Sequence, residues 1–301
     1  MLAHANLVIS QALCYDAPAL SGETMNPTSP LSLHDVSARV SENRDLGAAH
    51  FLLTLEAEPI AAAATPGQFV MLRFAGSLDP LLPRPMSVSD VLPADATQPG
   101  RIQVLHKVVG RGTDRLAALK PGEHLQVLGP LGKPFSVPSS ATPGSRAVMV
   151  AGGIGVAIFP FLVPALQGAG LKPLLLFGSR SSKELVRKDW FAGQGVEVRT
   201  ATEDGSDGTK GLVTTLLREV LSSQPEVAIV YAWGPHAMLK AVGGLVMESG
   251  VSSQLSLESY MGCGIGACLG CVVKVRRESG FAYARICVDG PTFPASEVLW
   301  E

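Results

Sequence analysis

Three cysteines lie close together near the carboxyl end of the chain, and a fourth follows them. Cys263, Cys268 and Cys271 form a C-x4-C-x2-C pattern, and Cys287 comes after a further fifteen residues. The chain does not begin with a basic segment followed by an apolar one, so we expect no signal peptide. Clustered cysteines in a protein that is not secreted indicate a metal site or redox chemistry rather than structural disulfides.

The spacing of these cysteines narrows the choice of metal. Plant-type ferredoxins use C-x4-C-x2-C with a distant fourth cysteine to hold a [2Fe–2S] cluster. The loop is rich in glycine (Gly262, Gly264, Gly266 and Gly270), which lets it curl and exposes backbone N–H groups to cluster sulfurs. A zinc site is the alternative, although such sites usually pair two C-x2-C units. Reduced structural thiols are a third interpretation, and Cys14 is expected to remain unligated.

Bulk composition excludes several classes of function. Apolar residues make up 47% of the 301 residues, charged residues 17%, and the net charge is −2. This composition is typical of a folded globular chain, and the absence of a dense Lys/Arg cluster argues against nucleic-acid binding. No apolar run reaches the roughly 18–20 residues of a membrane span. We therefore expect a cytoplasmic protein that uses neither nucleic acid nor membrane.

Changes in pattern along the chain predict a multi-domain β and α/β protein. We expect a loosely structured leader over 1–32, an antiparallel β-barrel over 33–140, a doubly wound parallel-sheet domain over 141–250 and a small cysteine domain over 251–301. Met25 is an alternative start, which leaves open whether residues 1–24 are translated. The boundary after the barrel falls in a stretch rich in Ser, Pro and Gly, residues 136–146.

The two larger regions differ in rhythm. Short apolar runs over 50–57, 67–75, 101–109 and 124–130, separated by Gly and Pro, predict the barrel strands, with 112–122 as its one helical insert. Farther on, apolar strands over 147–153, 172–179, 196–204 and 227–235 alternate with helical segments over 210–221 and 235–249. This alternation predicts a parallel sheet covered on both faces.

Two segments of the barrel region have the residue types of a flavin site. Prolines hold the chain extended around Arg84 in "LLPRPMSVSD", so its guanidinium suits a pyrophosphate, and the Ser87 hydroxyl suits a flavin ring edge. A turn with a surface arginine is the plainer interpretation. Thr113, in "VVGRGTDRL", precedes a helix whose amino end attracts phosphate, or serves simply as its N-cap.

Three glycine-bearing strand ends predict a nicotinamide site. In "AVMVAGGIGVAIFPFL", Gly153 and Gly155 fit a phosphate-binding turn, but Ile158 occupies the third glycine position. Further glycines end the strands near 177–182 and 232–239. Since ligands bind beyond the carboxyl ends of parallel strands, these turns are expected to meet there. Arg180 suits an adenosine 2′-phosphate or solvent, so the choice between NAD and NADP stays open.

With these sites in order, the chain resembles the electron-transfer subunit of class 1B, NAD-dependent dihydroorotate dehydrogenase, within the ferredoxin reductase superfamily. The resemblance covers about residues 33–301. It rests on "RPMS" (84–87), "GRGT" (110–113), "LGPLG" (128–132), "AGGIGV" (151–156), "WGPHAML" (233–239), "CGIGACLGC" (263–271) and "CVDGPTFPASEV" (287–298). The cysteine stretch and the closing segment are its most specific parts.

The resemblance implies an oxidoreductase subunit with three cofactors. It assigns FAD to Arg84, Pro85, Met86, Ser87, Leu105, His106, Lys107, Gly112 and Thr113. It assigns NAD, as the electron acceptor, to Gly152, Gly153, Gly155 and Gly234, and the [2Fe–2S] cluster to Cys263, Cys268, Cys271 and Cys287. Electrons from the FMN of a dihydroorotate dehydrogenase catalytic subunit would cross the cluster and FAD to NAD+, in pyrimidine biosynthesis. Two copies of each chain would form a heterotetramer, and no catalytic residue is assigned.

Departures from the family pattern leave rival functions open. Trp233 stands where a cysteine is usual beside the nicotinamide, and its bulk is expected to obstruct or reshape that pocket. Ala157 and Ile158 stand where prolines are common. One rival is a reductase subunit of another complex, of the sulfide dehydrogenase, hydrogenase or transhydrogenase type. The other is a zinc-stabilised binding module without flavin.

Overall fold

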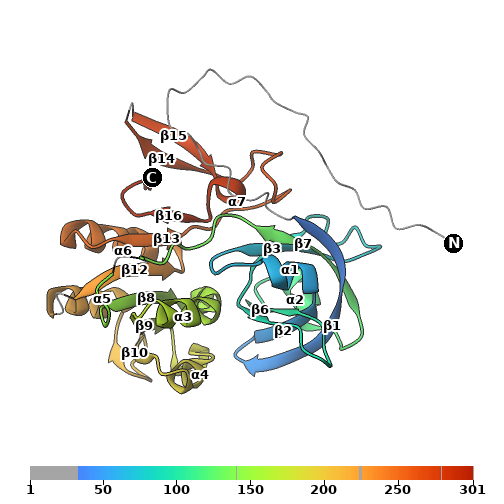
Figure 1. Ribbon diagram of the computed structural model, residues 1–301, viewed down its shortest axis with the longest axis horizontal. Helices are drawn as coiled ribbons and strands as arrows, with labels where there is room; N and C mark the ends of the chain where they lie inside the picture. Colours follow the sequence, from blue (N-terminus) through green and yellow to red (C-terminus); the bar gives the residue numbers. More distant parts are fainter. Residues whose placement is uncertain (1–32, 140, 224–225, 279, 301) are drawn as a thin grey trace. The chain divides into compact units, whose positions relative to one another are not determined.

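The computed structural model describes residues 33–139, 141–223, 226–278 and 280–300. The predicted leader over 1–32, with Cys14 and Met25, lies outside the described residues. All described residues belong to one unit, which runs from Ser32 to Glu301. Two seven-stranded sheets and one two-stranded sheet form its framework (Figure 1).

The first sheet is antiparallel and contains the amino-terminal strands. Its order is β4-β3-β7-β1-β2-β6-β5. The strands are β1 (His34–Gly47), β2 (His50–Glu56), β3 (Phe69–Arg73), β4 (Arg84–Ser87), β5 (Asp90–Leu92), β6 (Arg101–Lys107) and β7 (His124–Leu131). The segment from Arg84 to Leu92 curls the sheet, because its first half pairs with β3 and its second half pairs with β6. The predicted antiparallel architecture is confirmed as a half-barrel.

Two elements of the half-barrel differ from the sequence prediction. β1 is its longest strand, yet only Ala38 and Val40 are fully buried along it, so its sequence lacks a strong apolar run. Two helices are present here instead of one: α1 (Glu58–Ala63) precedes α2 (Arg111–Ala117). The prediction of a single helical insert was wrong, because the six-residue helix α1 is also present, with Pro59 in its first turn and Ile60 buried in the barrel core.

The second sheet is parallel apart from its last strand. Its order is β11-β10-β9-β8-β12-β13-β16. The strands are β8 (Arg146–Gly152), β9 (Lys172–Ser179), β10 (Glu197–Thr202), β11 (Thr209–Lys210), β12 (Val227–Trp233), β13 (Ser253–Ser256) and β16 (Thr292–Pro294). β16 pairs antiparallel with β13, and all other pairs are parallel. The carboxyl ends of β8, β9 and β12 therefore share one edge.

Helices cover both faces of this sheet. α5 (Val213–Ser223) and α6 (His236–Ser249) pack with Val148, Val150 and Leu174 on one face. The short helix Gly153–Ile158, then α3 (Phe159–Gly168) and α4 (Lys188–Gly193), pack with the alternate residues on the other face. A further short helix spans Ser182–Glu184. Because neighbouring strand residues point to opposite faces, both sets are apolar, as the continuous runs predicted.

The cysteine region combines a loop, a hairpin and one helical turn. The hairpin joins β14 (Val272–Arg277) to β15 (Gly280–Arg285), and α7 (Ile286–Asp289) carries Cys287 (Figure 1). In the chain, β13 precedes this region's loop and β16 follows α7. These two strands pair with each other at the edge of the second sheet. The limits of the three predicted domains stay a prediction. Within the described part of the chain, no helix has the length and apolar character needed to cross a membrane.

Candidate functional site

The four predicted cysteines lie together around the loop that joins β13 to the hairpin. The backbone N–H of Cys268 donates to the Cys263 sulfur at 3.4 Å. Cys271 and Cys287 are buried, and their thiols are in hydrogen-bonding contact. The thiols therefore form two pairs, one nearer the surface and one in the apolar core.

This arrangement suits two metal ions better than one. Among residues 33–300 as described, no three His, Cys, Asp or Glu side chains converge on a single metal position. A structural zinc ion requires four ligands around one point. A [2Fe–2S] cluster instead takes two thiolates on each of its irons. The donor set fits the cluster, with Cys263 and Cys268 as one pair and Cys271 and Cys287 as the other.

Two glycines of the loop are required by its close packing. Gly264 has a φ of +75°, and a Cβ there would lie 2.5 Å from the Met71 side chain of β3. Gly266 has a φ of +81°, and its Cβ would lie 2.8 Å from Val288. Larger residues would combine left-handed strain with a collision. The loop is thus held between the half-barrel and α7.

The electrostatics of the two pairs differ. Burial disfavours ionisation of the Cys263 thiol, but the backbone N–H groups of Cys268, Ile265 and Ala267 outweigh this and lower its pKa to about 7. Burial, together with contact with Cys271, raises the pKa of the Cys287 thiol to about 12. The Cys287 thiol thus becomes a thiolate at neutral pH only when a metal cation supplies compensating charge.

Most of the predicted flavin residues line one cavity of about 260 Å³. From the half-barrel they are Pro85, Met86, Ser87, Leu105, His106, Lys107 and Thr113. The remaining wall includes Ile154 and Trp233 from the parallel sheet, and Glu258 and Met261 from the segment before the cysteines. The structure therefore brings the three predicted flavin segments together at one place.

Arg84 and Gly112 meet each other outside this lining. A Cβ on Gly112 would collide with the Arg84 guanidinium, which donates to the Leu82 carbonyl at 2.8 Å. Thr113 is not the N-cap of α2, as one interpretation had it, because Gly110 holds that position. Its hydroxyl instead accepts hydrogen bonds from the backbone N–H groups of Val109 and Gly110. The first and third flavin segments are thus joined by direct packing.

Buried polar atoms facing this cavity fit a polar cofactor. Neither ring nitrogen of His106 has a well-formed partner among the described residues, and the ring stacks on Phe51 at 5.8 Å. Burial and the neighbouring His50 lower the pKa of His106 to about 4, so the ring is neutral at pH 7. The Trp233 indole nitrogen is likewise buried without such a partner. A ligand with a polar ring edge would satisfy these groups.

The predicted nicotinamide residues line a second cleft, of about 570 Å³. Gly152, Gly153, Gly155 and Gly234 all contribute to it. Ser179 and Arg180 add the end of β9, and Met238 adds the first turns of α6. The three glycine-bearing strand ends thus meet at the edge where a dinucleotide binds in such sheets.

Gly155 is fixed by contact between neighbouring strand ends. A Cβ at this position would collide with the carbonyl oxygen of Trp233. Ile158, at the third fingerprint position, is buried in the core and does not line the cleft. The turn therefore departs from the usual fingerprint because its first helical turns are a 3-10 helix that packs inward.

We expect Gly155→Ala to destabilise the chain by about 2–3 kcal/mol, because overpacking against backbone has no room to relax. Gly168→Ala is the matched control, since its Cβ would meet nothing within 4 Å at the end of α3. That control should be neutral or slightly stabilising. Urea unfolding of both variants measures the difference, and equal stability of the two would contradict the role of the Trp233 contact.

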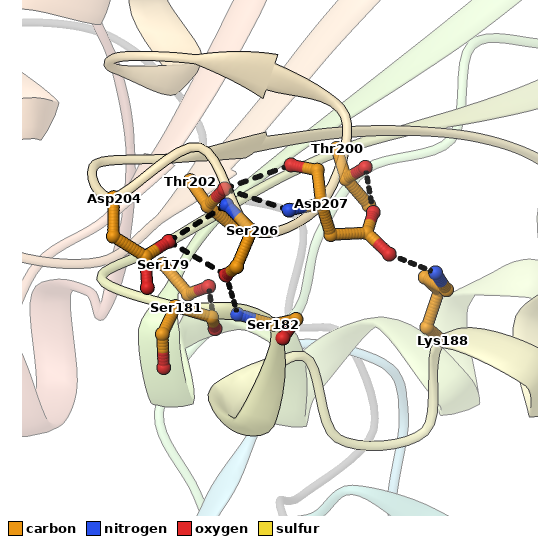
Figure 2. Close-up of polar contacts among 9 residues, drawn as sticks. All are labelled: Ser179, Ser181, Ser182, Lys188, Thr200, Thr202, Asp204, Ser206 and Asp207. Atoms are coloured by element: carbon orange, nitrogen blue, oxygen red, sulfur yellow. Dashed lines mark hydrogen bonds and ion pairs between the residues drawn. The ribbon is translucent and has the colours of Figure 1, made fainter.

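Polar contacts hold the loop after β10, and Glu203 at the start of this loop lines the cleft. Asp207 lies between the Thr200 hydroxyl at 2.5 Å and the Lys188 ammonium at 2.6 Å (Figure 2). The backbone N–H of Ser182 donates to the Ser206 hydroxyl at 2.7 Å. These contacts tie the loops after β9 and β10 to each other and place Glu203 at the rim.

Three residues line both cavities and mark where they meet: Lys107, Ile154 and Glu258. The Glu258 residue is exposed to solvent, although protein atoms surround much of its carboxyl group. Burial therefore raises its pKa, while a contact with Trp233 opposes that shift. The sequence motifs do not predict Glu258 or Ile154 as site residues, because each lines the cavities only through its position in the folded chain.

Comparison with known proteins agrees with this geometry. Residues 258–299 match the family model of the iron–sulfur cluster binding domain of dihydroorotate dehydrogenase B. A curated relative from Desulforamulus reducens, a dihydroorotate dehydrogenase B (NAD(+)) electron transfer subunit, is 38% identical over 83% of this chain and 93% of its own length. A relative of the same name from Caldanaerobacter subterraneus subsp. tengcongensis is 40% identical over 88% of this chain and 98% of its own.

The chain belongs to the family of dihydroorotate dehydrogenase B electron transfer subunits.

Solved structures support the fold of this electron transfer subunit. An NADH-dependent reduced ferredoxin-NADP oxidoreductase, studied for flavin-based electron bifurcation, is 28% identical with a TM-score of 0.74. The match covers 88% of this chain and 90% of that one. The ferredoxin reductase of carbazole 1,9a-dioxygenase, 23% identical with a TM-score of 0.61, covers 73% of this chain and 67% of that one. The ferredoxin-reductase-like fold is thereby confirmed.

Trp233 lies against the flavin cavity of this electron transfer subunit, at the end of β12. Its side chain lines that cavity but does not line the dinucleotide cleft, where Gly234 takes over. The lining of the two cavities therefore does not support the expectation that Trp233 obstructs the nicotinamide directly. The residue instead forms a wall of the space assigned to the flavin.

Proposed function

We propose that this chain carries electrons from a dihydroorotate dehydrogenase catalytic subunit to NAD+. The observation that carries the proposal is one short segment that touches all three sites. Glu258 lines both the dinucleotide cleft and the flavin cavity, and Met261 lines the flavin cavity. Cys263 follows two residues later, a step of at most about 7 Å along the backbone.

The order of these sites matches the chemistry of the three groups. A [2Fe–2S] cluster moves single electrons, FAD collects two, and nicotinamide accepts them as a hydride. The four cysteines hold the cluster, and the segments around Arg84, His106 and Thr113 bind FAD. The glycine turns at the ends of β8 and β12 admit the dinucleotide. The proposed flavin site and the proposed dinucleotide site adjoin each other at Lys107, Ile154 and Glu258, as hydride transfer between the two cofactors requires.

The catalytic subunit is proposed to dock beside the cysteine loop. Large apolar side chains are exposed in this region, including Tyr260, Leu269, Phe281 and Tyr283. An exposed apolar surface of this kind marks a protein contact. We propose a partner that oxidises dihydroorotate on FMN, assembled as two chains of each kind in the cytoplasm. The chain alone would reduce dyes with NADH but would not oxidise dihydroorotate.

The two rival functions are less well supported. The curated relatives, which are 37–40% identical to this chain, are named for dihydroorotate dehydrogenase B. The bifurcating NADH-dependent ferredoxin-NADP oxidoreductase, which is nearer to the first rival, is less similar at 28% identity. A zinc-stabilised module without flavin would need all four thiols around one metal ion, and it would leave the cavity lined by Met86, His106 and Thr113 without a ligand.

A visible absorption spectrum of the purified chain, recorded before and after anaerobic addition of NADH, tests the proposal. Flavin bands and a broad iron–sulfur shoulder are expected, and NADH should bleach both. A chain that stays colourless after reconstitution with FAD, iron and sulfide would refute the electron-transfer function. Cofactors that are present but not bleached would refute the nicotinamide step.

A further inference from the structure

Three charged side chains meet inside the dinucleotide cleft. Glu184, in the short helix after β9, places one carboxylate oxygen 2.8 Å from the Arg180 guanidinium and 3.1 Å from the Lys107 ammonium. All three line the cleft. Arg180 follows the last residue of β9, whereas Lys107 comes from β6 of the half-barrel. One carboxylate therefore engages two cations from two different sheets.

The ion pair between Arg180 and Glu184 affects which dinucleotide the cleft can bind, because of where Arg180 lies. An arginine near the end of the second strand of such a sheet accommodates the 2′-phosphate that distinguishes NADP from NAD. Here the Arg180 guanidinium is already paired with a carboxylate, the group that most resembles a phosphate in charge and geometry. A 2′-phosphate would have to displace Glu184 before it gained the same cation.

Glu184 is not easily displaced or neutralised. Its side chain is only 16% exposed, and the buried contact with Lys107 holds it from the side of the half-barrel. Burial by itself would raise the pKa of Glu184, but its contacts with Arg180 and Lys107 lower that pKa below its usual value. The carboxylate therefore stays charged at neutral pH.

The remaining charges of the cleft act in the same direction. Its charged lining consists of two cations, Lys107 and Arg180, and three carboxylates, Glu184, Glu203 and Glu258, which sum to 2 − 3 = −1. A dianionic 2′-phosphate would enter a site of like charge. A free 2′-hydroxyl is neutral and can donate a hydrogen bond to a carboxylate such as Glu203.

We infer that Glu184 is a specificity-determining residue, which makes the cleft reject dinucleotides with a 2′-phosphate by occupying Arg180. The inference rests on the proposed function, in which this cleft binds the dinucleotide acceptor. It adds which residue excludes NADP(H) and how. It also explains why an arginine at the 2′-phosphate position does not make the site select NADP.

The test uses two probes that differ only by the 2′-phosphate: 5′-AMP and adenosine 2′,5′-bisphosphate. Neither carries nicotinamide, so binding to the full chain, measured by isothermal titration calorimetry, does not depend on electron transfer. The wild-type chain should bind 5′-AMP at least as tightly as the bisphosphate. Glu184→Gln frees Arg180 and should tighten bisphosphate binding roughly ten- to a hundredfold, the worth of a charge-assisted hydrogen bond, with little change for 5′-AMP.

Matched variants separate this mechanism from a general change of charge. Glu197→Gln removes an equal charge from a carboxylate that also pairs with two cations, Arg146 and Arg199, outside the cleft. It should leave both affinities unchanged. Adding Arg180→Gln to Glu184→Gln should abolish the gain. If Glu184→Gln does not fold, Arg180→Gln alone still decides, because an arginine that is already neutralised can be lost without weakening bisphosphate binding.

Three results would overturn the inference. They are an unchanged preference in Glu184→Gln, a gain that persists in the double variant, and a large loss of bisphosphate affinity in Arg180→Gln alone. The proposed function fails separately, when NADH does not bleach the flavin of the wild-type chain. A chain with the expected adenosine preferences but no bleaching would keep the role of Glu184 and refute the redox proposal.

Discussion

Cys268→Ser is expected to lower electron transfer from the catalytic subunit by at least about a hundredfold, while NADH oxidation by a dye remains nearly unchanged. Substitution of a residue that only hydrogen-bonds to a metal ligand already lowers metal affinity or activity by about 10–100-fold. Substitution of a ligand itself should lower them further. Cys268 is the exposed member of its pair, so the substitution buries no hydroxyl group. The fold should therefore survive, and the dye reaction needs only FAD and the dinucleotide cleft.

The measurements are iron and acid-labile sulfide per chain, the visible spectrum, and dihydroorotate-dependent NADH formation with the partner present. Cys14→Ser is the control, because this cysteine lies outside the matched cluster domain of residues 258–299. It should retain full iron content. If Cys268→Ser keeps its iron and sulfide while Cys14→Ser loses them, the assignment of the ligands is wrong.

The sequence alone allows a cluster to be assigned to the cysteine region because the chemistry of such a site is local. Three of the proposed ligands lie within nine residues, and their spacing is set by the metals rather than by the rest of the fold. The flavin and dinucleotide segments could be predicted in part for the same reason, since Gly155 and Gly234 are needed where strand ends approach each other. The presence of helices on both faces of the parallel sheet could be predicted from the continuous apolar runs of its strands.

The residues that the sequence did not predict act through long-range packing. Glu184 has no motif of its own, and its role appears only when Lys107, 77 positions earlier, is placed beside it. Glu258 likewise becomes notable because two cavities meet at it. β1 was missed because its buried residues are few and small, so pairing with β2 and β7 decides its conformation.

Trp233→Ala is expected to destabilise the chain by about 3–5 kcal/mol and to weaken FAD binding by more than about tenfold. The indole is 8% exposed, so its removal leaves a void in the core beside Ala151 and Tyr231. That void opens into the flavin cavity, which Trp233 lines. Trp233→Phe keeps most of the apolar wall, so it should retain the fold and lose only what the buried N–H contributes.

Trp190→Ala is the matched control, because Trp190 packs on Phe191 and under Arg187, and does not line the flavin cavity. It should leave FAD affinity unchanged while losing some stability.

FAD dissociation constants and urea unfolding are measured for all three variants, with the fall in tryptophan emission on FAD addition as a further reading. If Trp233 lies against the flavin, that fall should be much smaller in Trp233→Phe than in the wild type. Unchanged FAD affinity in Trp233→Ala would instead show that Trp233 supports the core without shaping the flavin site. In that case packing at the end of β12 alone would explain the tryptophan at position 233.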